Sequence, residues 1–120
     1  MLEKIKEILE SFNMPNYYGL STHNKDKDWN YFVFNRSSIG KSGTSKRDFK
    51  FNYQIHIIME EYIPEGFGLE VIKAIEEGTK LKLADKDHVF NYMVKPNTEM
   101  VVEMLTLEFT RPKKVCDINV

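Results

Sequence analysis

The sequence of 120 residues has a single cysteine, Cys116, and a formal net charge of only −1. One cysteine excludes a disulfide within the chain and a zinc site built on several cysteines. A net charge near zero provides no overall field that would attract nucleic acid or an anionic lipid surface. The chain also lacks a run of about 18 apolar residues, and its first residues alternate charged and apolar side chains, so we expect neither a membrane-spanning helix nor a signal peptide.

The composition that remains is that of one folded domain. Hydrophobic residues make up 42% of the chain and charged residues 29%, which argues against extensive disorder. A chain of this length can enclose one hydrophobic core. We therefore expect a single α+β domain over residues 1–112, followed by a C-terminal tail over residues 113–120.

The clearest pattern is the alternation of apolar and polar residues over 49–58. Apolar side chains occupy every second position, at Phe49, Phe51, Tyr53, Ile55 and Ile57. Polar side chains occupy the positions between them, at Lys50, Asn52, Gln54 and His56. Because successive side chains of a strand point to opposite faces, this pattern predicts a long strand with one buried face. We expect it to begin near Arg47 and to end near Tyr62.

Apolar residues at helical spacing predict two helices, over Leu2–Phe12 and Gly68–Glu77. Shorter apolar segments predict further strands at residues 29–35, 81–83, 88–94 and 100–110. Pro112 is expected to end the last strand, and residues 13–19 are expected to form a turn. Connections of hairpin length favour an antiparallel sheet of about four or five strands with both helices packed against one face.

Few residues carry a pattern typical of catalysis or metal binding. Residues 35–42 end in Gly-Lys-Ser, as a phosphate-binding loop does, but the first glycine and the following helix of that motif are missing. The histidines His23, His56 and His88 are scattered, and no acidic residue lies at metal-ligand spacing beside His56 or His88, so surface histidines are expected. We predict no catalytic residue, no metal site, no cofactor and no enzymatic activity. A catalytic set built from residues distant in sequence remains an alternative.

One charged segment has a possible role in binding. Residues 36–45 are rich in serine and glycine and show no periodicity, which predicts a long mobile loop. Four basic residues surround this loop, at Arg36, Lys41, Lys46 and Arg47. One interpretation is a solvated loop tip. The other is a docking arm that becomes ordered against an acidic partner, which makes these four the candidate interface residues.

The order of these segments also resembles a known family. The resemblance covers residues 1–112, and its carriers are the helix 2–12 with Tyr17-Tyr18-Gly19, the strand Tyr31-Phe32-Val33-Phe34, the strand 51–57, the helix 68–77 and the strand 104–109. In this layout the chain resembles the bacteriophage tail terminator and head–tail joining family. Its members are small minor structural proteins of tailed phages and prophages in low-GC Gram-positive hosts.

The resemblance implies a homo-oligomer, typically a hexameric ring, that caps the tail tube and joins it to the head. The implied partners are the tail tube protein and the head connector proteins, with no membrane and no specific nucleic-acid binding. The implied location is the neck of the virion, after synthesis in the cytoplasm of the bacterial host. A head-completion (stopper) protein and a small non-viral binding or immunity module remain alternatives.

Overall fold

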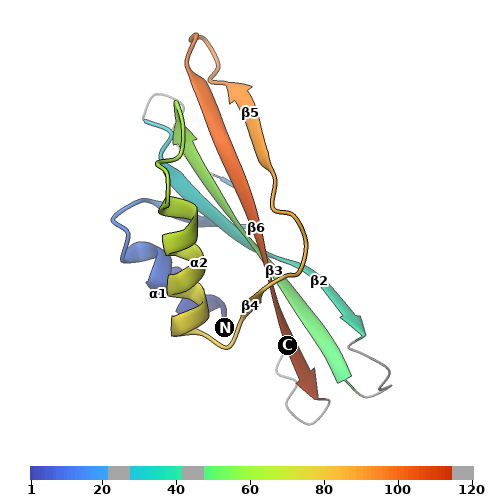
Figure 1. The fold of residues 1–120 in the computed structure, drawn as a ribbon. Helices are drawn as coiled ribbons and strands as arrows, with labels where there is room; N and C mark the ends of the chain where they lie inside the picture. Colours follow the sequence, from blue (N-terminus) through green and yellow to red (C-terminus); the bar gives the residue numbers. More distant parts are fainter. Residues whose placement is uncertain (22–27, 42–47, 115–120) are drawn as a thin grey trace.

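The computed structural model describes residues 1–21, 28–41 and 48–114 of the chain. They form two helices and a six-stranded, mostly antiparallel sheet (Figure 1). In chain order the elements are α1 (Leu2–Glu10), β1 (Asn16–Tyr18), β2 (Tyr31–Lys41), β3 (Asp48–Glu60), α2 (Phe67–Gly78), β4 (Lys82–Leu83), β5 (Phe90–Val94) and β6 (Val101–Lys114). The expected α+β fold, with two helices packed against a sheet, is confirmed.

Three long strands form the centre of the sheet. The strand order is β1-β2-β3-β6-β4. Strand β5 also pairs with β6, on the same edge as β4 but nearer the start of β6. The antiparallel pairing of β3 with β6 runs from Asp48 opposite Lys114 to Glu60 opposite Val102. The predicted strand over residues 49–58 is therefore the central strand of the sheet. The ends of β2, β3 and β6 nearest the C-terminus of β6 extend beyond both helices (Figure 1).

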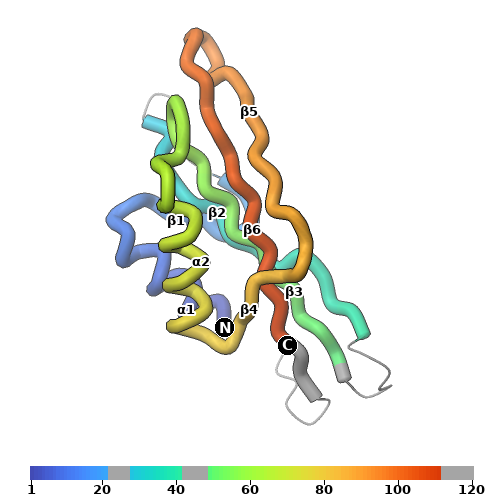
Figure 2. Tube along the Cα trace, viewed as in Figure 1, coloured from blue at the N-terminus to red at the C-terminus, as the bar shows by residue number. Residues whose placement is uncertain are grey.

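The main core lies between the sheet and the two helices, which run side by side over one face (Figure 2). Ile5 and Leu9 of α1 and Val71 and Ile75 of α2 are almost completely buried in it. The sheet contributes the buried side chains of Phe32, Phe34, Ile55, Ile57, Leu105, Leu107 and Phe109. We call this side of the sheet the helix face. The predicted buried side of β3 is thus confirmed at Ile55 and Ile57.

The opposite side of the sheet, the open face, carries a smaller apolar cluster. Its buried members are Tyr31, Val33, Ile58 and Val102. Tyr17, Trp29 and Met104 pack against it. This cluster explains why Tyr31 and Val33 are apolar although they alternate with Phe32 and Phe34, which face the helices.

The expected mobile loop at residues 36–45 is wrong for residues 36–41, which belong to β2. The strand continues because Lys41 still pairs with Phe49 of β3. A shift of register between Arg36 and Ser38 marks a β-bulge, which places an extra residue in β2. Serine and glycine therefore occupy a paired strand at a sheet edge. Residues 42–47 lie outside the described part of the chain.

Two further expectations need correction. Pro112 does not end β6, which continues to Lys114. Backbone hydrogen bonds alternate between the two edges of β6, so the nitrogen of Pro112 faces away from β3. On that other edge β4 pairs only with Thr110 and Phe109. The missing N–H of Pro112 therefore costs no hydrogen bond between strands. In addition, the predicted turn at residues 13–19 contains β1, which pairs parallel to β2.

Candidate interaction surfaces

The four basic residues chosen from the sequence are only partly within the described structure. Arg36 lies at the bulge of β2, and Lys41 is the last residue of that strand; both side chains are exposed. The ammonium group of Lys41 lies 4.4 Å from the centre of the Phe49 ring, a distance typical of a cation–π contact. Lys46 and Arg47 lie outside the described residues.

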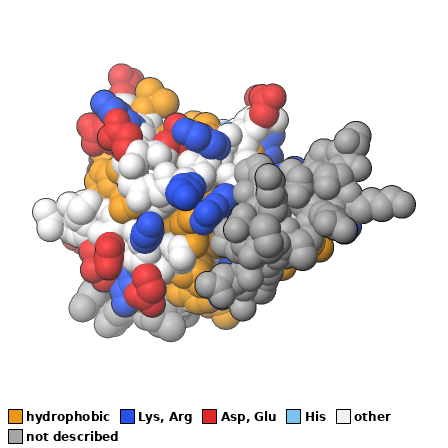
Figure 3. Space-filling view, turned by 90° about the horizontal axis from the view of Figure 1, so that it is seen from below, with side chains coloured by type: hydrophobic (Ala, Val, Ile, Leu, Met, Phe, Trp, Pro, Cys, Tyr) orange, Lys and Arg blue, Asp and Glu red, His pale blue; other side chains and the backbone are white. Residues whose placement is uncertain are grey.

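Arg36 contributes to a hollow of about 800 Å³ on the helix face, at the point where the sheet extends beyond α1. We call it the basic hollow. It is lined by Met1, Leu2, Glu3, Arg36, Ser37, Ser38, Ile39, Phe51, Asn52, Tyr53 and Arg111. Two arginines and one carboxylate give this lining a positive charge. Lys and Arg side chains gather beside hydrophobic ones when the molecule is viewed from this end (Figure 3).

Arg36 and Arg111 both lie close enough to Tyr53 to affect the ionisation of its hydroxyl. Burial raises the pKa of the Tyr53 hydroxyl above its usual value, and the positive charges of Arg36 and Arg111 partly oppose this increase. Guanidinium groups bind carboxylates and phosphates in a bidentate manner. The basic hollow therefore has the chemistry to accept acidic side chains of another protein. Sequence reasoning missed Arg111, although its position two residues after Phe109 places it on the helix face.

A second hollow, of about 490 Å³, lies between α2 and the pair β5–β6. We call it the β5 groove. Leu105 and Leu107 of β6 line it, together with Leu69 and Ile72 of α2 and Phe90 of β5. Its lining is mainly apolar, and most of Leu69 and about half of Phe90 are exposed to solvent.

The polar side chains of Glu65, His88 and Glu103 also line the β5 groove. The carboxylate of Glu103 is buried and accepts a hydrogen bond from the backbone N–H of Ile63 at 2.7 Å. It also accepts one from the hydroxyl of Tyr92, which raises the pKa of Tyr92. His88 Nε2 is buried and has no hydrogen-bond partner among the described residues. Glu103 thus fixes the segment before α2 and the edge strand β5 at the same time.

His56 is not a surface histidine but part of a polar row on the open face. Its Nε2 lies 3.0 Å from Asn35 Oδ1, and its Nδ1 lies 2.9 Å from the hydroxyl oxygen of Thr106. Because the amide oxygen of Asn35 can only accept, Nε2 carries a proton, and in the neutral imidazole Nδ1 accepts from the Thr106 hydroxyl. Burial lowers the pKa of His56. The row links β2, β3 and β6, which indicates a structural role.

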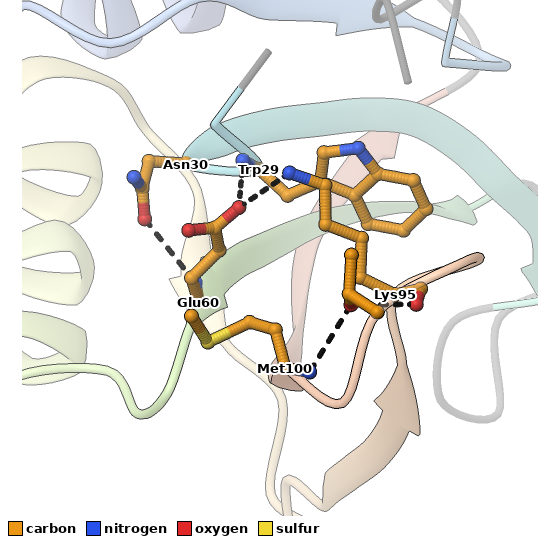
Figure 4. A network of polar contacts seen from close by, with 6 residues as sticks. Trp29, Asn30, Glu60, Lys95 and Met100 are labelled. Atoms are coloured by element: carbon orange, nitrogen blue, oxygen red, sulfur yellow. Dashed lines mark hydrogen bonds and ion pairs between the residues drawn. The ribbon is translucent and has the colours of Figure 1, made fainter. Parts of the chain in front are cut away.

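At the other end of the sheet, a polar network joins the start of β2, the end of β3 and the turn between β5 and β6 (Figure 4). Glu60 Oε1 accepts the backbone N–H of Trp29 at 3.0 Å and the ammonium group of Lys95 at 2.8 Å. The backbone N–H of Glu60 in turn donates to Asn30 Oδ1. We call this network the Glu60 latch. The hydrogen bonds from Lys95 and Trp29 lower the pKa of Glu60.

The described ranges contain no group of three or more His, Cys, Asp or Glu residues that could hold a metal ion. No helix in the same ranges has the length and apolar character needed to span a membrane. The candidate sites of the described structure are the two hollows, the basic hollow and the β5 groove. A comparison with models of known protein families gives no match, and neither does a comparison with curated proteins.

Proposed function

We propose that this chain is a structural subunit of the tail–head junction of a bacteriophage or prophage. The proposed role is that of a tail terminator, which assembles as a ring, hexameric in the family that the sequence resembles, and joins the tail tube to the head. The observation that carries the proposal is a sheet with exposed apolar residues at both of its edges, Tyr18 on β1 and Phe90, Tyr92 and Val94 on β5. Subunits of a ring need two different contact surfaces, one for each neighbour.

The basic hollow supplies a third surface, suited to the tail or the head connector. Arg36 and Arg111 line it, and Lys41 lies farther along β2 on the same face. Charges of this kind steer an acidic partner and mainly alter the rate of association. We therefore assign the docking role of Arg36, Lys41, Lys46 and Arg47, together with Arg111, to contact with an acidic surface of a tail or connector protein.

The experiment mixes the purified protein with phage tails that lack it and follows binding by light scattering and negative-stain imaging. Rings at one end of the tails are expected. Tails that bind no protein, or that bind it without forming a ring, would overturn the proposal.

Two matched variants then test the docking surface. In the first, Arg36, Lys41, Lys46 and Arg47 are replaced by glutamine. In the control, Lys4, Lys6, Lys73 and Lys80, on or beside the helices, are replaced by glutamine, which changes the net charge equally. The first variant should bind tails more slowly and with a weaker salt dependence, whereas the control should bind as the unaltered protein does. Equal rates for both variants would refute the docking role.

The same hollow also suits an immunity or adaptor module that binds one acidic partner. This second candidate differs in stoichiometry, since it predicts a complex with one copy of each chain. The mass of the complex with the partner separates the two functions, because a ring requires several copies on one tail.

A further inference from the structure

The outer edge of β5 presents unpaired backbone groups. Lys95 N–H donates to Met100 O, and Thr106 N–H donates to Val89 O, so the odd-numbered residues of this segment bond to β6. Because hydrogen bonding alternates along an antiparallel pair, the N–H and C=O groups of Phe90, Tyr92 and Val94 point outward. In the described part of the chain, β6 is the only strand that pairs with β5.

The outer edge of β1 is unpaired in the same sense. Phe32 N–H donates to Pro15 O, and Gly19 N–H donates to Phe34 O, so the odd-numbered residues of this segment bond to β2. The backbone groups of Asn16 and the N–H of Tyr18 therefore point outward. Within the described ranges, β1 pairs with β2 alone.

Neither edge strand contains a bulge, a lysine or a proline, which are common protections against pairing between molecules, although β1 is short, with three residues. β5 contains no charged residue and no proline, and Phe90, Tyr92 and Val94 are 48%, 64% and 57% exposed. Beside β1, Tyr18 is 52% and Leu20 82% exposed. Bulges, lysines and prolines protect edge strands in most proteins.

The free edge of β2 beyond β1 provides a contrast within the same sheet. It carries a bulge next to Arg36 and ends in Lys41, which are the protections that β1 and β5 lack. The unprotected edges are therefore a property of β1 and β5 and not of every edge in this fold.

We infer that β5 of one copy pairs antiparallel with β1 of the next copy, so that the sheets of neighbouring copies are continuous. This inference rests on the proposed function, since it names the contact that builds the ring. The occupant is a second copy because the two edges match. They run in opposite directions, since β1 is parallel to β2 whereas β5, β6, β3 and β2 alternate in direction.

The positions of the two edges also match along the strands. Asn16 of β1 lies opposite Phe32 of β2, and Phe32 pairs with Ile57 of β3. Ile57 pairs with Leu105 of β6, and Leu105 pairs with Phe90 of β5. Asn16 and Phe90 therefore lie in one row across the sheet. Joining the edges places neighbours side by side, with little displacement along the strands, as a closed ring requires.

The side chains on the two edges lie on the same face. Tyr18 packs edge-on against Phe34, which faces the helices. Phe90, in turn, lies opposite Leu105, which also faces the helices. Pairing Tyr18 with Phe90 and Asn16 with Tyr92 uses the outward groups of both strands and adds an aromatic pair on the helix face.

The size of this contact predicts when the ring forms. Few exposed apolar side chains lie at the two edges, namely Tyr18, Leu20, Phe90, Tyr92 and Val94, so the contact is expected to be smaller than the about 1,200–2,000 Å² of a standard stable interface. Single contacts should therefore be weak, and the free protein should be monomeric at low concentration. Simultaneous contact with a tail raises the effective concentration of neighbouring copies and closes the ring.

Disulfide cross-linking tests the inference. Cys116 is first replaced by serine, and two proteins are made, one with Asn16→Cys and one with Tyr92→Cys. A mixture of the two, concentrated and oxidised, should give a dimer that contains one copy of each, while neither protein alone should cross-link. A control mixture with Lys4→Cys and Glu70→Cys, on the two helices, should stay monomeric.

The outcomes separate this contact from other arrangements. Dimers from Tyr92→Cys protein alone would mean that two β5 strands pair with each other, which overturns the inference. The absence of a mixed dimer at high concentration, and on tails, would overturn it as well.

A second pair of variants tests the edge within the assembled ring. Tyr92→Pro removes an outward N–H without removing a bond to β6, whereas Tyr92→Ala keeps that N–H. Rings on tails should form with Tyr92→Ala and be lost with Tyr92→Pro. Rings that form with Tyr92→Pro would refute the edge contact but leave the proposed function intact. A mixed dimer from a protein that binds no tails would support the contact and refute the function.

Discussion

Breaking the ion pair of the Glu60 latch should destabilise the fold far more than breaking a surface pair on α2. In the latch, Lys95 Nζ lies 2.8 Å from Glu60 Oε1, and the two side chains are only 13% and 17% exposed. On α2, Lys73 and Glu77 are 4.0 Å apart, with side chains 75% and 68% exposed. The two pairs have the same chemistry and differ in distance and in contact with water.

These differences set the expected magnitudes. An exposed pair on a helix contributes about 0.3–0.5 kcal/mol, whereas removing one partner of a fully buried pair costs about 3–5 kcal/mol. The latch lies between these limits, so Lys95→Met should lower the free energy of unfolding by about 1–2 kcal/mol. Glu60→Ala should lower it by about 2–3 kcal/mol, because the N–H of Trp29 then also loses its acceptor.

A double-mutant cycle measured by urea unfolding isolates the pair energy. Lys95→Met and Glu60→Gln should show a coupling of about 1 kcal/mol, and Lys73→Met with Glu77→Gln about 0.3 kcal/mol. Because the folded pKa of Glu60 lies below its usual value of 4.5, its stabilising effect is complete above 4.5 and decreases as the pH falls through the folded pKa. Equal couplings for the two pairs, or a latch coupling unchanged at a pH where Glu60 is protonated, would refute this reasoning.

Three other variants test the core, the β5 groove and the open face. Ile55→Asp places an unpaired charge at a fully buried position and should abolish the cooperative thermal transition. Lys50→Asp, on the exposed side of the same strand, should shift the transition little. A normal transition for Ile55→Asp would mean that the helix face is wrongly assigned. Glu103→Gln should lower the pKa of Tyr92 towards 10.0, because the carboxylate that raises it is removed; an unchanged Tyr92 titration by NMR would disprove the hydrogen bond. Burial lowers the pKa of His56 from 6.5, so the folded protein binds fewer protons there than the unfolded chain, and the free energy of unfolding should decrease as the pH falls below 6.5 and level off below the folded pKa. His56→Gln should remove this pH dependence of stability. A pH dependence that persists would assign it to another group.

The parts of the fold that the sequence predicts correctly are those with a local period. Ile55 and Ile57 alternate with polar residues, and Ile5 and Leu9 recur at helical spacing, so their burial follows from neighbouring residues alone. The two strand segments that were missed, residues 36–41 of β2 and the strand β1, depend on distant partners. Residues 36–41 carry no apolar alternation and are extended because β3 pairs with them, and β1 is too short to show any period.

The candidate site shows the same division. Arg36 was chosen from a local cluster of positive charge, and the structure places it in the basic hollow. Arg111 was missed because it is 75 residues away in sequence and is brought close only by the pairing of β6 with β3 beside β2. The unprotected edges of β1 and β5 could not be predicted either, since an edge is defined by the absence of a neighbouring strand and not by the strand itself.

The extension of the sheet beyond the helices implies a gradient of amide protection within single strands. The molecule measures 51 × 25 × 24 Å, and the helices cover only part of its length (Figure 1). Amides near Ile55, beneath α1 and α2, should exchange with deuterium only on global unfolding, whereas those of residues 48–50 should exchange through local fraying. Because β3 spans both regions, an acidic partner in the basic hollow would slow exchange at the frayed end and extend the rigid part of the same strand towards that partner.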